Sequence, residues 1–292
     1  MTSTPELAPA ARPSFASTLA VYLRPRVLIV MFLGFSSGLP LALSGSTLLV
    51  WMRETGVDLG TIGLFALVGT PYTLKFIWAP VVDALDVPLL SRWFGRRRGW
   101  LLLTQILLIA AIIFLGACDP ATAPGMVAFG ALLVAAASAT QDIVIDAFRV
   151  ESLPDNEQGA GMASYVAAYR IGTLASTAGA LFLVTGFEGL GLSKGDAWAW
   201  GYYTMAILAV IGIFTTFLAR EPELRAGAAH PDKTTHNALQ RVITSAVGAF
   251  SEFLTRDSAF AVLAFVILYK LCDAFAGTMT APFVIALGFT RN

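Results

Sequence analysis

The chain is 292 residues long, 57% of them hydrophobic and only 13% charged, and its formal net charge at pH 7 is zero. Soluble domains carry about 25% charged residues, so this composition excludes an ordinary soluble protein, and the balanced charge gives no sign of a nucleic-acid partner. Residues 100–118 and 197–219 contain no Asp, Glu, Lys, Arg or His. Because about 20 apolar residues cross a bilayer as one helix, we predict an all-α polytopic membrane protein.

Seven apolar segments divide the chain into four predicted regions. Residues 1–25 form a cytoplasmic tail, residues 26–219 a six-helix transmembrane bundle, residues 220–257 a cytoplasmic linker with an amphipathic helix, and residues 258–292 the first helix of an incomplete second bundle. The predicted membrane spans, read from the lengths of the apolar runs, lie near 27–52, 61–83, 100–118, 125–149, 158–186, 197–219 and 258–287.

Lysine and arginine are distributed unevenly between the two sides of the predicted bundle. Thirteen fall in the tail, in the loop 83–99, at Arg149 and in the linker, whereas three fall on the opposite side. Cytoplasmic loops carry the excess of basic residues, so the N-terminus and the linker are predicted to be cytoplasmic. The first 25 residues lack the basic-then-apolar order of a cleaved signal peptide.

Residues 237–256 have apolar side chains at helical spacing, with polar side chains largely on the rest of the helical wheel. The pattern predicts an amphipathic helix. It lies either on the cytoplasmic membrane face or against the helix bundle, and the sequence does not separate these two alternatives.

The seventh apolar segment echoes the first. A shift of 232 positions places Ala42 on Ala274 and Gly45 on Gly277. Transporters built from repeats bind their substrate between the halves, so the two glycines are predicted to face a shared centre. Gly45 and Ser46 are therefore candidate substrate contacts, although small residues also serve simple helix packing.

Ionisable side chains inside a bilayer are costly and are therefore candidates for function. Lys75 in the second span and Asp142 in the fourth lie at similar depths, so we predict that they pair. Asp146 lies one turn beyond Asp142, near Arg149 and the membrane surface. Intramembrane carboxylates mark proton relays, and a purely structural ion pair is the alternative. The candidate proton-coupling residues are Asp142, Asp146, Asp273 and Lys75.

Arg170 in the fifth span and Lys270 in the seventh are predicted to lie near the midplane, where fixed cations suit an anionic substrate. Tyr165 and Tyr169 are one turn apart on the fifth helix and can stack on a sugar ring, although packed aromatic residues are commoner. The candidate substrate-binding residues are Arg170, Tyr165, Tyr169, Gly45, Ser46, Gln141 and Lys270.

The cysteines and histidines give no sign of a metal or a cofactor. Cys118 and Cys272 match no metal-binding or disulfide spacing, and His230 and His236 fall in the polar linker. We therefore expect no cofactor.

Four stretches of the spans combine small, polar and charged residues at set helix positions: 34–43, 71–80, 141–151 and 269–277. These stretches resemble the AmpG-type muropeptide permeases of the major facilitator superfamily, and the resemblance extends from Arg24 to Asn292. A further set of four residues resembles the superfamily's signature loop between helices two and three. The loop has an insertion here, and alanine stands where a glycine is usual. The set consists of Asp83, Gly95, Arg96 and Arg97.

The resemblance implies a major facilitator-like six-helix bundle followed by a seventh transmembrane helix. It also implies proton-coupled import of anhydromuropeptides from periplasm to cytoplasm for cell-wall recycling, in a bacterial inner membrane. The implied partners are the anhydromuropeptide, protons and membrane lipid. The superfamily has two halves of about six helices each, so a missing C-terminal bundle is expected to be needed for transport.

Several alternatives remain open from the sequence. A superfamily transporter of another solute, such as acetyl-coenzyme A, a sugar or a peptide, fits the same pattern, and so does a structural or regulatory membrane fragment. The enzyme alternative is a magnesium-dependent membrane prenyltransferase that binds a diphosphate through Asp142 and Asp146. The residues before Asp142 do not fit its first motif, so no enzymatic activity is expected.

Overall fold

The computed structural model describes residues 19–223 and 237–286, with side chains as far as Cys272. All regular secondary structure in these ranges is helical. The chain divides into two compact units, residues 1–230 and 231–292, and each is described by itself. The side chain of Asp273 lies outside the described residues.

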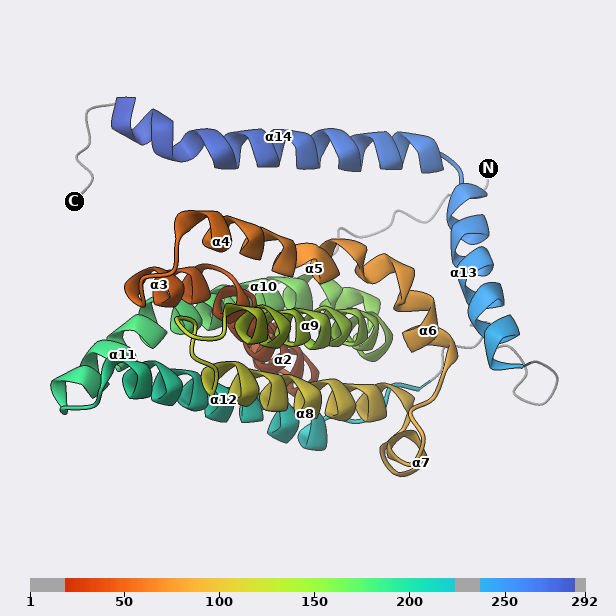
Figure 1. Ribbon diagram of the computed structural model, residues 1–292. Coiled ribbons are helices and arrows are strands. Elements are labelled where there is room, and N and C mark those ends of the chain that lie inside the picture. Colours follow the sequence, from red (N-terminus) through yellow and green to blue (C-terminus); the bar gives the residue numbers. More distant parts are fainter. Residues whose placement is uncertain (1–18, 224–236, 287–292) are drawn as a thin grey trace, which may run out of the picture. The chain divides into compact units, whose positions relative to one another are not determined.

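Within the described residues, six segments are long and apolar enough to cross a bilayer, which confirms the six spans predicted for the first unit (Figure 1). Short helices flank or join them: η1 (Val21–Leu23), α6 (Ala79–Ala84) and α7 (Leu90–Phe94). In chain order the spans comprise α2 (Pro25–Ser44) with α3 (Ser46–Glu54); α4 (Leu59–Leu64), η2 (Phe65–Gly69), α5 (Thr70–Leu74) and η3 (Lys75–Ile77); α8 (Arg96–Gly116); α9 (Pro124–Ser152); η4 (Asp155–Glu157), α10 (Gln158–Leu174), η5 (Ala175–Gly179) and α11 (Ala180–Gly189); and α12 (Lys194–Leu218).

The first span is interrupted where its helix α2 ends. Pro40 lies inside α2, and Gly45 adopts φ −114° and ψ −113° before α3 begins. The Ser44 hydroxyl donates to the Pro40 carbonyl at 3.0 Å, a side-chain contact that bends helices. A shift of 232 positions places Pro40 on Cys272, and helix α14 (Ala259–Ala286) continues unbroken through Gly277. The two matched spans therefore differ in helix continuity at this position, where the first has proline and the seventh has cysteine.

The most extensive helix–helix contact among the described residues joins α2 and α10. A Cβ atom placed on Gly38 would lie 2.1 Å from the Tyr169 carbonyl oxygen, and one on Gly34 would lie 2.6 Å from the Tyr165 carbonyl oxygen. From the other side, a Cβ atom on Gly172 would lie 2.4 Å from a backbone oxygen of α2. Glycine therefore sets the distance between these helices, as small residues do in membrane bundles.

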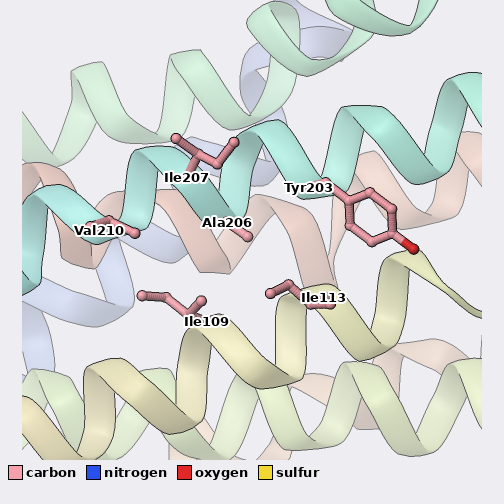
Figure 2. Close-up of a pocket in the computed structure, with 6 residues that line it drawn as sticks. All are labelled: Ile109, Ile113, Tyr203, Ala206, Ile207 and Val210. Atoms are coloured by element: carbon pink, nitrogen blue, oxygen red, sulfur yellow. The ribbon is translucent and has the colours of Figure 1, made fainter.

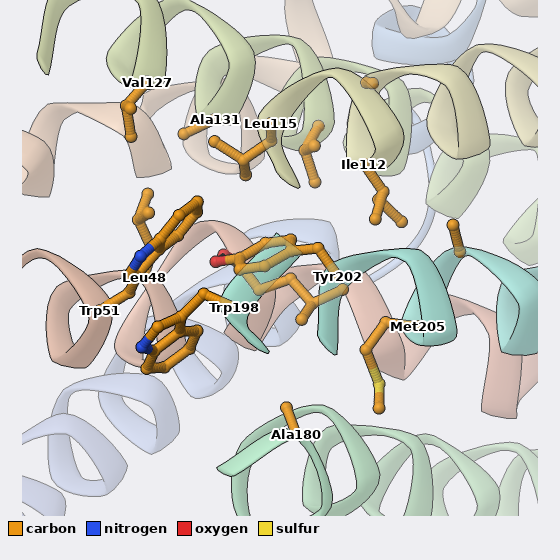
Figure 3. Close-up of a cluster of buried hydrophobic side chains, with 14 of the residues drawn as sticks. Leu48, Trp51, Ile112, Leu115, Val127, Ala131, Ala180, Trp198, Tyr202 and Met205 are labelled. Atoms are coloured by element: carbon orange, nitrogen blue, oxygen red, sulfur yellow. The ribbon is translucent and has the colours of Figure 1, made fainter. Parts of the chain in front are cut away.

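A cluster of buried aromatic rings packs α3 against α12 (Figure 3). Trp51 of α3 and Trp198 of α12 are stacked with ring centroids 5.6 Å apart, and Tyr202 lies 5.1 Å from Trp51. The Trp198 Nε1–H donates to Glu54, and the Tyr202 hydroxyl donates to the Leu43 carbonyl at 2.8 Å. Two of the three polar ring atoms are thus paired, which ties the first span to the sixth.

The second unit consists of α13 (Ala238–Leu254) and α14. Asn237 and Gln240 form a capping box at the start of α13, in which the Gln240 side chain accepts the Asn237 backbone N–H at 3.3 Å. The helix predicted over 237–256 is therefore present, with an explicit N-terminal cap.

The Gly38 contact generates a stability prediction. We expect Gly38→Ala to lower the melting temperature of the detergent-solubilised chain, because the added Cβ forces α2 and α10 apart at a cost of about 1–3 kcal/mol. Gly186→Ala in α11 is the matched control, since no atom lies within 4 Å of its added Cβ. Equal melting temperatures for the two variants would contradict the close contact.

Candidate functional site

One group of charged residues links three helices at the end of the bundle that carries the 83–99 loop. The buried Arg97 side chain donates to Asp83 Oδ1 at 2.8 Å and to Glu151 Oε2 at 2.9 Å. Arg96 donates to the Asp83 carbonyl oxygen and lies 3.5 Å from Glu151. The predicted signature residues therefore meet at one place, and Glu151 at the end of α9 completes the group.

The start of α8 is held by a residue that the sequence analysis assigned to the linker. Gly95 adopts φ +92°, a conformation that favours glycine, and α8 begins directly after it. Glu221 accepts the backbone N–H groups of Arg97 and Arg98 at 2.8 and 3.0 Å. A carboxylate satisfies the unpaired donors at a helix N-terminus, so Glu221 caps the start of α8.

The second charged group lies within the membrane-spanning part of the bundle. Lys75 Nζ lies 3.5 Å from Asp142 Oδ2, so the predicted pair is present. The Ser37 hydroxyl donates to Asp142 Oδ1 at 2.5 Å and lies 3.1 Å from the Tyr165 hydroxyl. Four helical segments (α2, η3, α9 and α10) thus each contribute one side chain to this group.

Exposure differs between the members of this group, which we call the Asp142 network (Ser37, Lys75, Asp142 and Tyr165). The Asp142 side chain is 13% exposed and that of Lys75 is 33% exposed, while Ser37 is buried. The Asp142 carboxylate is therefore held inside the bundle, and the Lys75 side chain is the more exposed partner. A short 3-10 turn carries Lys75 between Pro71 and Pro80, where the second span is irregular.

Asp146 and Tyr169 lie at the edges of the Asp142 network. Asp146 is exposed and its carboxylate forms a local ion pair with the Arg149 guanidinium, 3.9 Å away. The rings of Tyr165 and Tyr169 are tilted with centroids 6.2 Å apart. The Tyr169 backbone packs on Gly38, so the α2–α10 contact fixes the position of both tyrosines.

Gln141 lies in a different environment from its neighbour Asp142. It is fully buried, and its Nε2 lies 3.5 Å from the hydroxyl of buried Ser36. Gln105 and Thr216 form a second buried polar pair at 3.1 Å. This packing differs from the substrate-binding role predicted for Gln141, because consecutive helical residues point about 100° apart and only Asp142 faces the network.

Three other predicted substrate residues of the first unit, Arg170, Gly45 and Ser46, make no hydrogen bond or ion pair with the Asp142 network. Arg170 is exposed, and no carboxylate lies within ion-pair distance of it in the described part of the chain. Ala168 and Gly172 are buried in α10, and Arg170 is two residues from each of them. Two residues correspond to about 200° around a helix, so Arg170 lies on the face of α10 opposite the α2 contact. Gly45 and Ser46 lie at the break in the first span, with Ser46 exposed, and Lys270 lies on α14 in the second unit.

Sequence reasoning missed three of the residues that build these two groups: Ser37, Glu151 and Glu221. Ser37 lies between Gly34 and Gly38, and this stripe of small residues is the signal that it faces another helix. Glu151 is the last residue of a stretch already recognised, 141–151. Glu221 carried no local signal, because its partners are backbone groups 123 and 124 residues away.

Three grooves on the first unit, of about 330, 470 and 600 Å³, are lined by neither a charged side chain nor a member of the Asp142 network. A groove of about 330 Å³ between α8 and α12 is lined by apolar side chains and Tyr203 (Figure 2). No charged side chain lines it, and α8 and α12 carry none at mid-span. No group of three metal-ligating side chains occurs among the described residues.

Comparison with known proteins places the chain in a family. The profile of the Major Facilitator Superfamily matches residues 16–291. The anhydromuropeptide permease of Escherichia coli K12 is 42% identical over 272 residues, which cover 93% of this chain and 51% of that protein. The putative transporter AmpG 4 of Rickettsia conorii is 33% identical, with 91% of this chain and 61% of that protein covered.

The chain therefore spans between about half and three-fifths of the length of these relatives. Their names are those of permeases and transporters, not enzymes, which removes the prenyltransferase alternative. The superfamily match, the AmpG-type relatives and the six apolar spans agree with the resemblance seen in the sequence. The chain is a multi-pass membrane protein of the Major Facilitator Superfamily, related to the AmpG-type permeases.

Proposed function

We propose that this chain forms the N-terminal half and the first C-terminal helix of a proton-coupled transporter that imports anhydromuropeptides. The proposal places the protein in a bacterial inner membrane with its N-terminus in the cytoplasm. The name of the Escherichia coli relative supports the substrate class. The distribution of lysine and arginine supports the orientation.

The observation that carries the proposal is the Asp142 network. Its carboxylate is almost enclosed between α2, α9 and α10, and its ion-pair partner Lys75 lies on an irregular segment of the second span. An intramembrane carboxylate paired with one cation is the arrangement expected of a proton relay. Proton binding to Asp142 removes the counter-charge of Lys75.

That loss of counter-charge gives a simple coupling scheme. While Asp142 is ionised, Lys75 is neutralised by it and has little attraction for an anionic substrate. Once Asp142 holds a proton, the exposed part of Lys75 is available to a carboxylate of the substrate's peptide stem. Release of the proton restores the Lys75–Asp142 pair and displaces the substrate. Asp146, beside Arg149, is the next carboxylate along the same helix and provides the step toward the membrane surface.

Substrate binding requires groups from more than one helix. Tyr165 and Tyr169 present aromatic rings next to Asp142 and suit the sugar rings of a muropeptide. Arg170 is a permanent cation that can bind a carboxylate in bidentate fashion. Because it is exposed and turned away from α2, we propose that it binds a carboxylate of the substrate's peptide stem. Lys270 is proposed as a further substrate-binding cation and Asp273 as a further proton-coupling carboxylate. Gly45 and Ser46 provide a polar break in the first span.

Transport is proposed to need a second bundle beyond the residues of this chain. Superfamily transporters bind substrate near the midplane, between two six-helix halves. Anhydromuropeptide, protons and the surrounding lipid are the proposed partners. The 83–99 loop group around Arg97 would hold one end of the first bundle together as the two halves move.

Charge exchange tests the role of the Lys75–Asp142 pair. In the intact transporter we expect Lys75→Asp alone and Asp142→Lys alone each to reduce uptake of labelled anhydromuropeptide by about tenfold or more, because each leaves two like charges together in the membrane. The double exchange restores opposite charges and should recover more uptake than either single change.

The matched control for these variants is Glu188→Gln, which removes a charge from an exposed position at the end of α11. Its uptake should equal that of the unaltered protein, and membrane abundance of every variant should be compared by blotting. Independent, additive losses in the double variant at normal abundance would contradict the pair.

Thiol labelling tests the proposed orientation. In a chain with Cys118→Ser and Cys272→Ser, Lys194→Cys lies at the first residue of α12, next to the turn from α11, and Asn156→Cys lies between α9 and α10. A membrane-impermeant maleimide added to spheroplasts should modify the first from outside. It should modify the second only after the membrane is permeabilised. The reverse labelling pattern would overturn the orientation.

A further inference from the structure

Helix α13 has an apolar face that its own unit leaves uncovered. The large side chains on this face are 47–70% exposed, and they recur three or four residues apart. They are Leu239, Ile243, Val247, Phe250 and Leu254. At about 100° per residue, the apolar residues of α13 occupy one half of the helical wheel and the polar residues occupy the other half. The helix is thus amphipathic along its whole length.

The connection to α14 limits where this face can be. α13 ends at Leu254 and α14 begins at Ala259, so the two ends are at most about 17 Å apart. α14 has 28 residues and carries exposed apolar side chains such as Phe260 and Phe265, so it is about 42 Å long and can cross a bilayer. When α14 crosses the bilayer, the end of α13 lies at the membrane boundary.

The turn between the two helices sends them in different directions. Ser258 adopts φ +64°, and the Ala259 N–H bonds to the Arg256 carbonyl at 3.1 Å. Within this unit α13 and α14 run at a wide angle to each other (Figure 1). When α14 crosses the membrane, α13 is directed along the membrane surface rather than away from it.

Charge on α13 is nearly balanced. Between Ala238 and Leu254 the charged side chains are Arg241 and Glu252. Glu252 forms an ion pair at 2.6 Å with Arg256, which lies just beyond the end of the helix. The apolar area of α13, rather than attraction to a charged partner, therefore determines which surface the helix binds. An apolar helix face of this width, next to a membrane span, is suited to contact with lipid chains.

We propose that α13 is a membrane-surface helix, whose apolar half enters the lipid leaflet at which α14 begins. It would lie flat beside the entry point of the seventh span and fix that point relative to the leaflet. This lipid contact is separate from the proposed substrate site and does not depend on which solute is carried.

Spin labels at two positions of the full chain test the proposal. In the chain with Cys118→Ser and Cys272→Ser, one nitroxide is placed at Val247→Cys on the apolar face and another at Thr244→Cys on the polar face. Both positions are exposed. Each labelled chain is reconstituted in phosphatidylcholine vesicles, and collisions with oxygen and with a water-soluble nickel chelate are compared.

We expect the label at Val247 to collide more with oxygen than with the chelate, and the label at Thr244 to show the opposite preference. Chelate access at Val247 equal to that at Thr244 would overturn the proposal. So would a label at Val247 shielded from both reagents, which indicates packing against protein. Melting temperatures verify folding, and Phe250→Cys with Ser251→Cys provides a second pair if either first variant fails to fold.

Discussion

The close contact between α2 and α10 is the constraint on which the candidate site depends. Gly34, Gly38 and Gly172 have no side chain where the two backbones meet. This contact brings Tyr165 to the hydroxyl of Ser37, and Ser37 in turn donates to Asp142. If any of these glycines carried a side chain, the hydroxyl groups would move away from the carboxylate. The packing of two apolar helices therefore sets the polar chemistry in the bundle.

Two charged groups on the first unit differ in exposure and in geometry. The Arg97 guanidinium makes short hydrogen bonds to two carboxylates, and the Glu221 carboxylate accepts a backbone N–H at the start of α8. Such fully hydrogen-bonded ion pairs favour a fixed arrangement. Around Asp142 the ion pair with Lys75 is longer, 3.5 Å, and one partner is a third exposed. The looser pair is the better candidate for a group that changes partners during a cycle.

Much of the fold could be predicted from the sequence, because bilayer thickness and helix geometry leave few alternatives. The spans, the capped helix after Asn237 and the Lys75–Asp142 pair all follow from length, periodicity and depth. Depth alone does not give rotation about a helix axis. This is why the sequence did not show that Gln141 faces the packed interior, or that Arg170 lies on a different face of its helix from Tyr165 and Tyr169.

Residues whose partners are backbone atoms of distant helices could not be predicted at all. Glu221 binds two N–H groups of α8, and Thr47 donates to the Ser176 carbonyl at 2.6 Å. Nothing in the local sequence distinguishes these side chains from solvated ones. Contacts of this kind become visible only when the helices have been placed, since they depend on where each helix ends or deforms.

The most direct test of this account asks whether the α2–α10 contact controls the surroundings of Asp142. Infrared difference spectra between two pH values, recorded on the reconstituted chain, should contain a carboxyl band that Asp142→Asn removes. The account predicts that Gly38→Ala shifts this band, while Gly186→Ala leaves it in place. An unshifted Asp142 band in folded Gly38→Ala would contradict the claim that this helix contact positions the carboxylate.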